Sequence, residues 1–389
     1  MKFLFAMNLP YHPAVGGANK ANRLLAGMLA RKGHSVTAVV PALGTPARLT
    51  HRQFIDQLEE RYARIASGPG VDVFNIDDVE VHAVEQASQL RQHLIELTYR
   101  LKPDCTIVST EDPSHSLLDA AVKTNPERVV CIVHTPSFLP FGPQAFFPSS
   151  LRTKLFEQGI VLVAVSEFVK EYILRWGGLE STRIYLPVYG EGPFPSLGHY
   201  DNKFVTIVNP CTVKGIEIFK DLAQASPEIE FAFVPSWGTT EQDQVSLKKL
   251  SNVHLLPART DFDEILKQTR VLLLPSLWEE AFGLTVVEAM LRGVPVMASD
   301  VGGVAEAKLG TDFLLPVSPI SSFSENLDQN RIPIASLPEQ DIEPWRTGLV
   351  ELLSQREVYK QQAIAAQAAS SRFVANLGIE PLEDLLIDV

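Results

Sequence analysis

Two glutamates in the second half of the chain are the residues best suited to bind a ligand. The stretch 275–290, PSLWEEAFGLTVVEAM, ends an apolar run, passes two acids and a glycine, and continues as an apolar, helix-like segment. It contains Glu280 and Glu288, eight positions apart. Carboxylate oxygens accept hydrogen bonds from diols, and loops that follow parallel strands commonly bind ligands. We therefore expect these two acids to bind a hydroxyl-rich molecule.

The residues between the two acids are expected to open a helix. They are Phe282, Gly283, Leu284 and Thr285. The first backbone N–H groups of a helix have no partners within it and lie at its positive dipole end, so they can bind phosphate, and Gly283 permits close approach. The alternative is that the acids are solvated residues at the start of a helix. We favour this interpretation for Glu279.

A lysine and a pair of glycines complete a candidate diphosphate site. Lys214, in NPCTVKGIEIF, precedes a predicted helix and could supply positive charge to a departing diphosphate; the alternative is a surface lysine at a helix start. Gly16 and Gly17, in YHPAVGGANK, lie between a predicted strand and helix, where their amides can form the other side of a pyrophosphate site. The pattern is not G-x-G-x-x-G, and no acid ends the second strand, VTAVVPALG, which disfavours NAD binding.

Polar and aromatic residues also follow predicted strands of the first half. His134, in VVCIVHTP, ends a strand at the edge where ligands bind, although a lone histidine is more often a hydrogen-bonded structural residue. Glu111 and His115, with Asp112 in STEDPSHS, either serve an acceptor or cap a helix. Phe138 belongs to HTPSFLPFGPQAFFPSS, whose aromatic side chains either pack beneath the loop or line a pocket for a partly apolar acceptor.

Strand-like and helix-like segments alternate along the chain, which predicts parallel sheets covered by helices. Strands are expected near 2–9, 34–41, 104–110, 128–135 and 160–166, with a helix over 19–33. The Pro- and Gly-rich stretch 187–202 predicts a linker, after which the alternation resumes; 317–343 is loop-like and about 343–375 is helical. We therefore expect an α/β chain with Rossmann-like domains at 1–190 and 203–360, and consider a helix from about 360 to 389 packing back on the first domain.

Several blocks of the sequence, taken in order, resemble the retaining glycosyltransferases of family 4. They are GGANKANRLLAGMLARKGHSVTAVVP, VHTP, VSEFVKEYI, VKGIEIF and the E-x7-E stretch EAFGLTVVE followed by RGVPVMASDVGGVAE. The resemblance implies the GT-B fold, in which two Rossmann-like domains with parallel sheets face each other across a cleft. It also implies that the N-terminal domain binds the acceptor and the C-terminal domain binds the nucleotide-sugar donor.

The same resemblance assigns roles to individual residues. It implies that Glu280 contacts hydroxyls of the donor sugar, that Glu288 binds the ribose diol, and that Lys214 contacts the phosphates. It places His134 near the anomeric carbon, and Arg259, in LPARTDFDEIL, in the loop that contacts the base.

One position departs from the family pattern. The family usually has an arginine five residues before the lysine, and this chain has Asn209 there. Lys214 then carries more of the charge stabilisation. We consider Asn209 or Thr212 as a hydrogen-bond donor in place of the arginine.

We therefore expect a cofactor-free, metal-independent glycosyltransferase with Glu280, Lys214 and His134 as catalytic residues. It would transfer a sugar, with retention, from a nucleotide diphosphate sugar to a hydroxyl of a small or lipid-like, partly apolar acceptor; family frequency favours uridine diphosphate. Two alternatives stay open. One is an epimerase or phosphorylase of the same fold, and the other is a noncatalytic sugar-nucleotide-binding protein.

Composition and charge exclude other classes of function. With 46% hydrophobic and 21% charged residues, the chain has a globular composition. Residues 1–190 hold 19 Lys and Arg against 18 Asp and Glu, so the net charge of −12 falls on the second half. Neither a basic face for nucleic acid nor a basic amphipathic helix for membranes is apparent. No apolar run approaches the roughly 18 residues of a spanning helix.

The cysteines and the N-terminus favour a cytoplasmic protein. Cys105, Cys131 and Cys211 are odd in number, widely spaced and set in apolar surroundings, as expected of reduced thiols. The first apolar run stops at Pro10, which is too short for a secretory signal.

Overall fold

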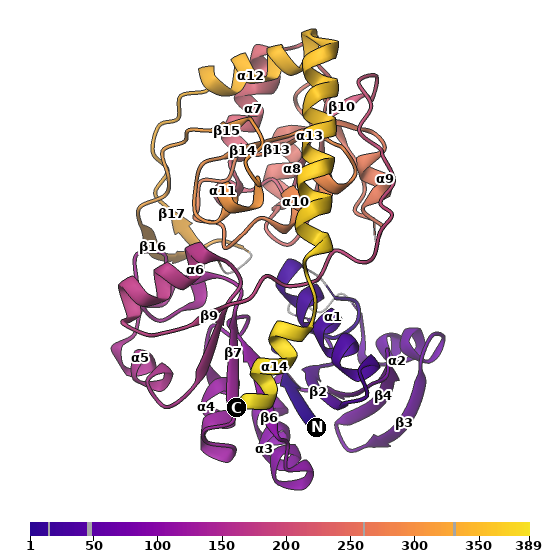
Figure 1. Cartoon of the computed structure of the whole chain (residues 1–389), viewed down its shortest axis with the longest axis vertical. Helices are drawn as coiled ribbons and strands as arrows, with labels where there is room; N and C mark the ends of the chain where they lie inside the picture. Colours follow the sequence, from indigo (N-terminus) through magenta and orange to yellow (C-terminus); the bar gives the residue numbers. More distant parts are fainter. Residues whose placement is uncertain (15, 45–48, 260, 330–331) are drawn as a thin grey trace. The chain divides into compact units, whose positions relative to one another are not determined.

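The computed structural model describes residues 1–14, 16–44, 49–259, 261–329 and 332–389. The chain divides into two compact units (Figure 1), one of residues 1–188 with 378–389 and one of residues 189–377. We expected a helix from about 360 onward to pack with the first domain, but the chain returns to the first unit later, at residue 378. Helix α13 (Arg356–Ala375) belongs to the second unit, and only residues 378–389 join the first.

The described part of the first unit contains a nine-stranded sheet in the order β3-β4-β5-β2-β1-β6-β7-β8-β9. The strands are β1 (Lys2–Ala6), β2 (Ser35–Pro41), β3 (Ala63–Gly68), β4 (Val71–Ile76), β5 (Val79–Val84), β6 (Cys105–Ser109), β7 (Val129–Val133), β8 (Val161–Ala164) and β9 (Thr182–Arg183). The helices are α1 (Gly17–Arg31), α2 (His51–Glu59), α3 (Leu90–Leu101), α4 (Ser116–Thr124), α5 (Ser150–Phe156), α6 (Glu167–Tyr172) and α14 (Glu380–Asp388).

Burial explains why the central strands are recognisable in the sequence and the edge strands are not. Every residue of β7, VVCIV, is buried, as is usual for a parallel strand covered on both faces. Strands β3 to β5 instead form antiparallel pairs, and every residue of β3 is exposed. In β4 (VDVFNI) and β5 (VEVHAV), polar residues interrupt the apolar ones, so no long apolar run forms. The sequence analysis predicted none of the three strands.

The described part of the second unit contains a parallel sheet in the order β12-β11-β10-β13-β14-β15. The strands are β10 (Phe204–Val208), β11 (Phe231–Val234), β12 (Val253–Leu255), β13 (Thr269–Leu274), β14 (Val296–Ser299) and β15 (Leu314–Leu315). The helices are α7 (Ile216–Ala225), α8 (Glu241–Leu247), α9 (Asp263–Leu266), α10 (Leu284–Leu291), α11 (Val304–Ala307), α12 (Glu343–Ser354) and α13.

The segment 317–343, which we expected to be loop-like, contains a small antiparallel pair. Its strands are β16 (Phe323–Leu327) and β17 (Pro333–Ala335). Four of the five residues of β16 are exposed, so this pair has little of the apolar patterning from which strands are predicted.

Each sheet has a switch point, a central strand from which the strand order runs in opposite directions, and ligands usually bind there. Strand β1 lies between β2 and β6, and β10 lies between β11 and β13. In doubly wound sheets, the crevice beyond the carboxyl ends of the strands that flank such a point is the common ligand site. The loops after β1, β6, β10 and β13 are therefore the places to look for functional residues.

The last twelve residues are fastened to the first unit by apolar and charged contacts. Ile379, Leu382 and Leu386 are buried. Lys32 pairs with Glu380 at 2.6 Å and with Glu383 at 2.9 Å.

The three cysteines are buried and unpaired, as expected. Among the described helices, none has the length and apolar character needed to cross a membrane.

Candidate functional site

Lys214 and Glu280 form an ion pair at the carboxyl edge of the second sheet. Lys214 ends a short 3-10 turn after β10, and Glu280 lies in the loop after β13, so the adjacency of these two strands brings the residues together. Their side chains are only 16% and 12% exposed. The sequence analysis placed both at a diphosphate and sugar site, and the structure brings them into direct contact.

Further contacts keep the Glu280 carboxylate charged. Ser276 donates its hydroxyl proton to Oε1 at 2.5 Å. Burial alone would raise the pKa of Glu280, but the Lys214 ammonium and the hydrogen bonds from Lys214, Ser276 and Trp278 lower it below its ordinary value. The Lys214 ammonium also lies 4.6 Å from the centre of the Trp278 ring, within cation–π range. At neutral pH the site therefore presents a hydrogen-bond acceptor beside a cation.

A glycine turn after β14 supports the Glu280 loop. The Gly303 amide donates to the Glu280 carbonyl at 2.7 Å. A Cβ at Gly302 would lie 2.5 Å from the same carbonyl oxygen, and Gly302 has a φ of +55°. Only glycine fits there without moving the loop. The sequence analysis quoted these glycines within the block RGVPVMASDVGGVAE and gave them no role, because their contact with the Glu280 loop depends on the fold.

The predicted helix start after Glu280 is present. Gly283, with a φ of +113°, immediately precedes α10, which begins at Leu284 and continues through Thr285. Glu288 lies just over one turn into α10 and is partly buried. The ring of Phe282 is buried and stacks on Phe373 at 5.8 Å, so its side chain packs in the second unit.

Glu279 is not a helix residue. It lies in the loop five positions before α10 begins, whereas we expected a solvated acid of the first helical turn. The glycine at the helix start delays the helix to Leu284, because Gly283 adopts a left-handed conformation.

Asn209, which lies where the resemblance predicts an arginine, connects two loops. It has a φ of +60°, and its Oδ1 accepts hydrogen bonds from the Gly238 amide at 2.8 Å and the Thr239 hydroxyl at 3.3 Å. Its Nδ2 is buried and has no partner among the described residues. Asn209 thus retains an unused donor at the end of β10.

Arg259, which the resemblance placed in the loop that contacts the base, lies exposed in the segment after β12.

In the first unit, the predicted glycines lie between β1 and α1, at the switch point, and the predicted histidine follows β7, the strand next to β6. Gly16, with a φ of +84°, precedes α1, and Gly17 is the first residue of that helix. His134 directly follows β7, and its Nε2 lies 2.8 Å from Oδ1 of Asn22 in α1. Burial lowers the pKa of His134 to about 3, so its ring is neutral at physiological pH.

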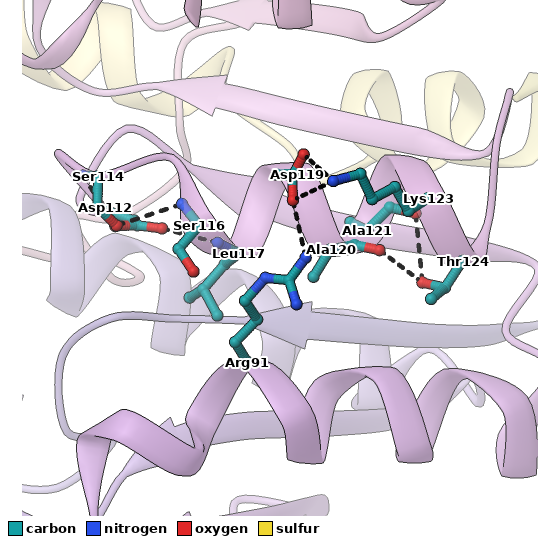
Figure 2. Close-up of polar contacts among 10 residues, drawn as sticks. All are labelled: Arg91, Asp112, Ser114, Ser116, Leu117, Asp119, Ala120, Ala121, Lys123 and Thr124. Carbon is teal, nitrogen blue, oxygen red and sulfur yellow. Dashed lines mark hydrogen bonds and ion pairs between the residues drawn. The ribbon is translucent and has the colours of Figure 1, made fainter.

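The polar cluster after β6 is largely structural. Asp112 accepts hydrogen bonds from Ser114 and from the Leu117 amide at 2.8 Å, which caps α4 (Figure 2). His115 donates from Nε2 to the Phe138 carbonyl at 2.7 Å, and the Phe138 ring packs edge-on against Phe146 at 5.7 Å. Of the two alternatives for this cluster, helix capping therefore holds for Asp112, and His115 fastens a loop.

Glu111 differs from its neighbours. No hydrogen bond joins its carboxyl to another described residue, and burial raises its pKa to about 7. An acid with these properties at a strand end can gain or lose a proton near neutral pH.

Two family models match the chain, one in each unit. Residues 15–186 match "Glycosyltransferase Family 4", and residues 211–329 match "Glycosyl transferases group 1". A curated relative, an uncharacterized 42.6 kDa protein in the cps region of Klebsiella pneumoniae, is 26% identical over 330 residues, which cover 78% of this chain and 86% of the relative.

Solved structures resemble the whole chain. A glycosyltransferase from Rickettsia africae has a TM-score of 0.67 at 14% identity, covering 100% of this chain and 98% of that one. HepE of Anabaena, in complex with UDP and glucose, has a TM-score of 0.65 at 19% identity and covers 99% of each chain. A TarM variant of S. aureus, in complex with fondaparinux, α-GlcNAc-glycerol and UDP, has a TM-score of 0.66 at 10% identity and covers 100% of each. These likenesses confirm the predicted GT-B fold of two Rossmann-like domains.

Proposed function

We propose that this chain, a glycosyltransferase with the GT-B fold, transfers a sugar, with retention, from a uridine diphosphate sugar to an acceptor hydroxyl. The observation that carries this proposal is the Lys214–Glu280 pair, held by Ser276 at the carboxyl edge of β10 and β13 beside the start of α10. It combines a cation, a hydroxyl-binding carboxylate and helix-start amides in one place.

The ion pair is suited to exchanging partners when the donor binds. The Lys214 ammonium turns from Glu280 to the diphosphate, and the freed Glu280 oxygen accepts a hydrogen bond from a sugar hydroxyl. Each charged group then keeps a charge-assisted partner, so neither is left buried and unpaired. Amides of the first turn of α10, with Nδ2 of Asn209, add donors for the phosphate oxygens.

The choice of uridine rests on similar proteins. HepE was solved with UDP and glucose, and the TarM variant was solved with UDP. In our proposal Glu288 accepts hydrogen bonds from the ribose diol, because it lies on α10 one turn beyond the phosphate-facing end. Arg259 lies in the segment we assign to the base, where backbone groups make the contacts.

Retention follows in this proposal from a same-face displacement. The bond between the anomeric carbon and the phosphate oxygen breaks, the acceptor oxygen bonds to the same face, and its proton passes to the departing phosphate. Lys214 and the helix-start amides stabilise the charge that develops on the leaving group, so the reaction needs no metal ion.

The proposed location is the cytoplasm, because the buried, free thiols suit a reducing compartment.

The proposed acceptor is a small or lipid-like, partly apolar molecule bound by the first unit. Glu111 is suited to accept a hydrogen bond from its hydroxyl, and the aromatic loop that contains Phe138 supplies apolar surface nearby in sequence.

Calorimetry with a nucleotide panel tests the donor site. Uridine, guanosine, adenosine and thymidine diphosphates and their sugars are titrated with EDTA present, and we expect selective binding of the uridine compounds. Glu288→Ala should weaken this binding at least 10-fold, whereas Glu351→Ala, which removes an exposed acid from α12 in the same unit, should not change it. Absence of binding for every nucleotide contradicts the proposal.

A transfer assay separates the remaining possibilities. Product formed from a uridine diphosphate sugar and an acceptor is examined by NMR, and the same anomeric configuration as in the donor is expected. Inverted product refutes the same-face mechanism. Change in the donor without an acceptor indicates an epimerase, and tight binding without turnover indicates a sugar-nucleotide-binding protein.

A further inference from the structure

Asn22 of α1 is a buried residue that touches the proposed catalytic histidine. It is 2% exposed, and both ends of its amide are hydrogen-bonded. Oδ1 lies 2.8 Å from Nε2 of His134, and Nδ2 donates to the Ser109 hydroxyl at 3.0 Å. The amide therefore connects α1 to the end of β6 and to the residue after β7.

The backbone beneath the histidine ring is held separately. The Thr110 hydroxyl oxygen accepts hydrogen bonds from the amides of His134 at 3.0 Å and Thr135 at 3.4 Å. Thr110 is itself only 1% exposed. With its backbone fixed by Thr110 and its ring fixed by Asn22, His134 has little freedom to reorient.

The Asn22 contact determines which ring nitrogen carries the proton. An amide oxygen can only accept a hydrogen bond, so Nε2 of His134 must donate to it. A neutral imidazole has a single N–H, so Nδ1 carries a lone pair. Among the described residues, none donates a hydrogen bond to Nδ1. This nitrogen can therefore accept a hydrogen bond from a hydroxyl, and it cannot donate one to a phosphate oxygen.

We propose that Asn22 is the positioning residue that holds His134 in the Nε2–H tautomer, so that Nδ1 accepts a hydrogen bond from a substrate hydroxyl. This inference rests on the proposed function for its last step, because a hydroxylated substrate must reach Nδ1. Its first step, the tautomer, is a property of the free protein. The two steps can therefore be tested separately.

Nitrogen NMR of histidine-labelled protein tests the tautomer. The chain has nine histidines, and loss of one pair of ring signals in His134→Gln assigns the residue. We expect a pyrrole-type signal for Nε2 and a pyridine-type signal for Nδ1 at pH 7. The reverse pattern in the wild-type protein would overturn the proposal.

Variants of α1 test whether Asn22 is the cause. Asn22→Ala should produce signals averaged between the two tautomers, and Asn22→Asp, which keeps an acceptor oxygen, should restore the Nε2–H pattern. Asn19→Ala is the matched control, because Asn19 lies on the same helix, is equally buried, and donates instead to the Pro10 carbonyl at 2.9 Å. An unchanged wild-type pattern in Asn22→Ala would refute the proposal.

Transfer assays test the second step. Removing the orienting partner of a catalytic histidine lowers turnover, by up to about 10⁴-fold when the wrong tautomer is imposed. Since Asn22→Ala leaves both tautomers accessible, we expect a roughly 10–100-fold fall in kcat/KM and partial recovery in Asn22→Asp. Full activity with an averaged tautomer refutes the role of Nδ1. Absence of transfer in the wild-type protein, with the Nε2–H pattern intact, refutes the proposed function and not the tautomer.

Discussion

At the scale of single residues, Lys214 and Glu280 depend on each other because both are mostly buried. Removing one member of such a pair leaves an uncompensated charge, which typically costs about 3–5 kcal/mol. Lys214→Met should therefore lower the free energy of unfolding of the second unit strongly. Glu280→Gln in the same chain should recover part of this loss, with a coupling energy of roughly 1–3 kcal/mol. Urea unfolding followed by tryptophan fluorescence measures all four proteins of the cycle. Strict additivity of the two substitutions would show that the pair is not coupled.

From the raised pKa of Glu111 we predict that kcat/KM for the acceptor depends on pH. Burial raises its pKa to about 7, so its carboxylate form is present above pH 7 and is lost as the pH falls through 7. If the carboxylate binds the acceptor hydroxyl, kcat/KM for the acceptor should rise through pH 7 and level off above it. In Glu111→Gln this rise should disappear while the donor KM stays unchanged. A rise that persists in the variant would assign the titration to another group.

The sequence predicted the acids and the lysine of the candidate site but missed part of their surroundings. Glu280, Glu288 and Lys214 belong to short stretches whose order along the chain is informative. The hydrogen bond from Ser276 depends on the conformation of the loop that it shares with Glu280, and the contact of Asn22 with His134 depends on how α1 packs on the sheet. Neither the course of an irregular loop nor a contact between residues 112 positions apart follows from residue spacing, and for this reason they were not predicted.

At the scale of elements, the glycine turn after β14 determines where the Glu280 loop lies. Gly302→Ala would place a Cβ 2.5 Å from the Glu280 carbonyl, so we expect a loss of donor affinity of at least 10-fold in calorimetry with the fold retained. Gly310→Ala is the matched control, because its φ is also positive, at +78°, but its Cβ would have open space. The two variants share the backbone strain and differ in the contact with the loop. Equal losses in both would assign the effect to strain.

The buried ammonium of Lys308, at the end of α11, should make the free energy of unfolding depend on pH. Its ammonium donates to the Val296 carbonyl of β14, and burial lowers its pKa from 10.5 to about 7. Between these values the unfolded chain binds one proton more than the folded chain, so stability rises with pH by about 1.4 kcal/mol per unit. Lys308 therefore lowers the free energy of unfolding most at and below pH 7, and this destabilisation disappears as the pH rises toward 10.5.

Replacing Lys308 with methionine tests this linkage. The free energy of unfolding of the wild-type protein, measured by urea titration, should rise from pH 7 to pH 9 relative to that of Lys308→Met. The difference between the two curves isolates this lysine from other titrating groups. A constant difference across the range would mean that Lys308 stays protonated in the folded protein.

At the scale of the whole molecule, strand alternation predicted two parallel α/β sheets, and local patterning was insufficient for their edges. The buried strands read as short apolar runs, whereas β3 is exposed along its whole length and β16 over most of it. The return of residues 378–389 to the first unit was also hard to locate. Helices α13 and α14 follow each other closely, and the residues between them contain no linker signal comparable to 187–202.

This return makes the stability of the first unit depend on residues at the far end of the sequence. Leu382 is fully buried in α14, and Leu382→Ala should cost about 2–5 kcal/mol. Because α14 belongs to the first unit, hydrogen exchange should speed up in β1 and β2 and stay unchanged in β10 and β13.

Leu352→Ala supplies the matched comparison for Leu382→Ala. Leu352 is equally buried, in α12 of the second unit, so the same deletion should produce the opposite pattern of exchange. Exchange that quickens in both units after either substitution would show that the units unfold together. In that case, the second unit would also depend on α14 for its stability, although its own sheet and core do not include that helix.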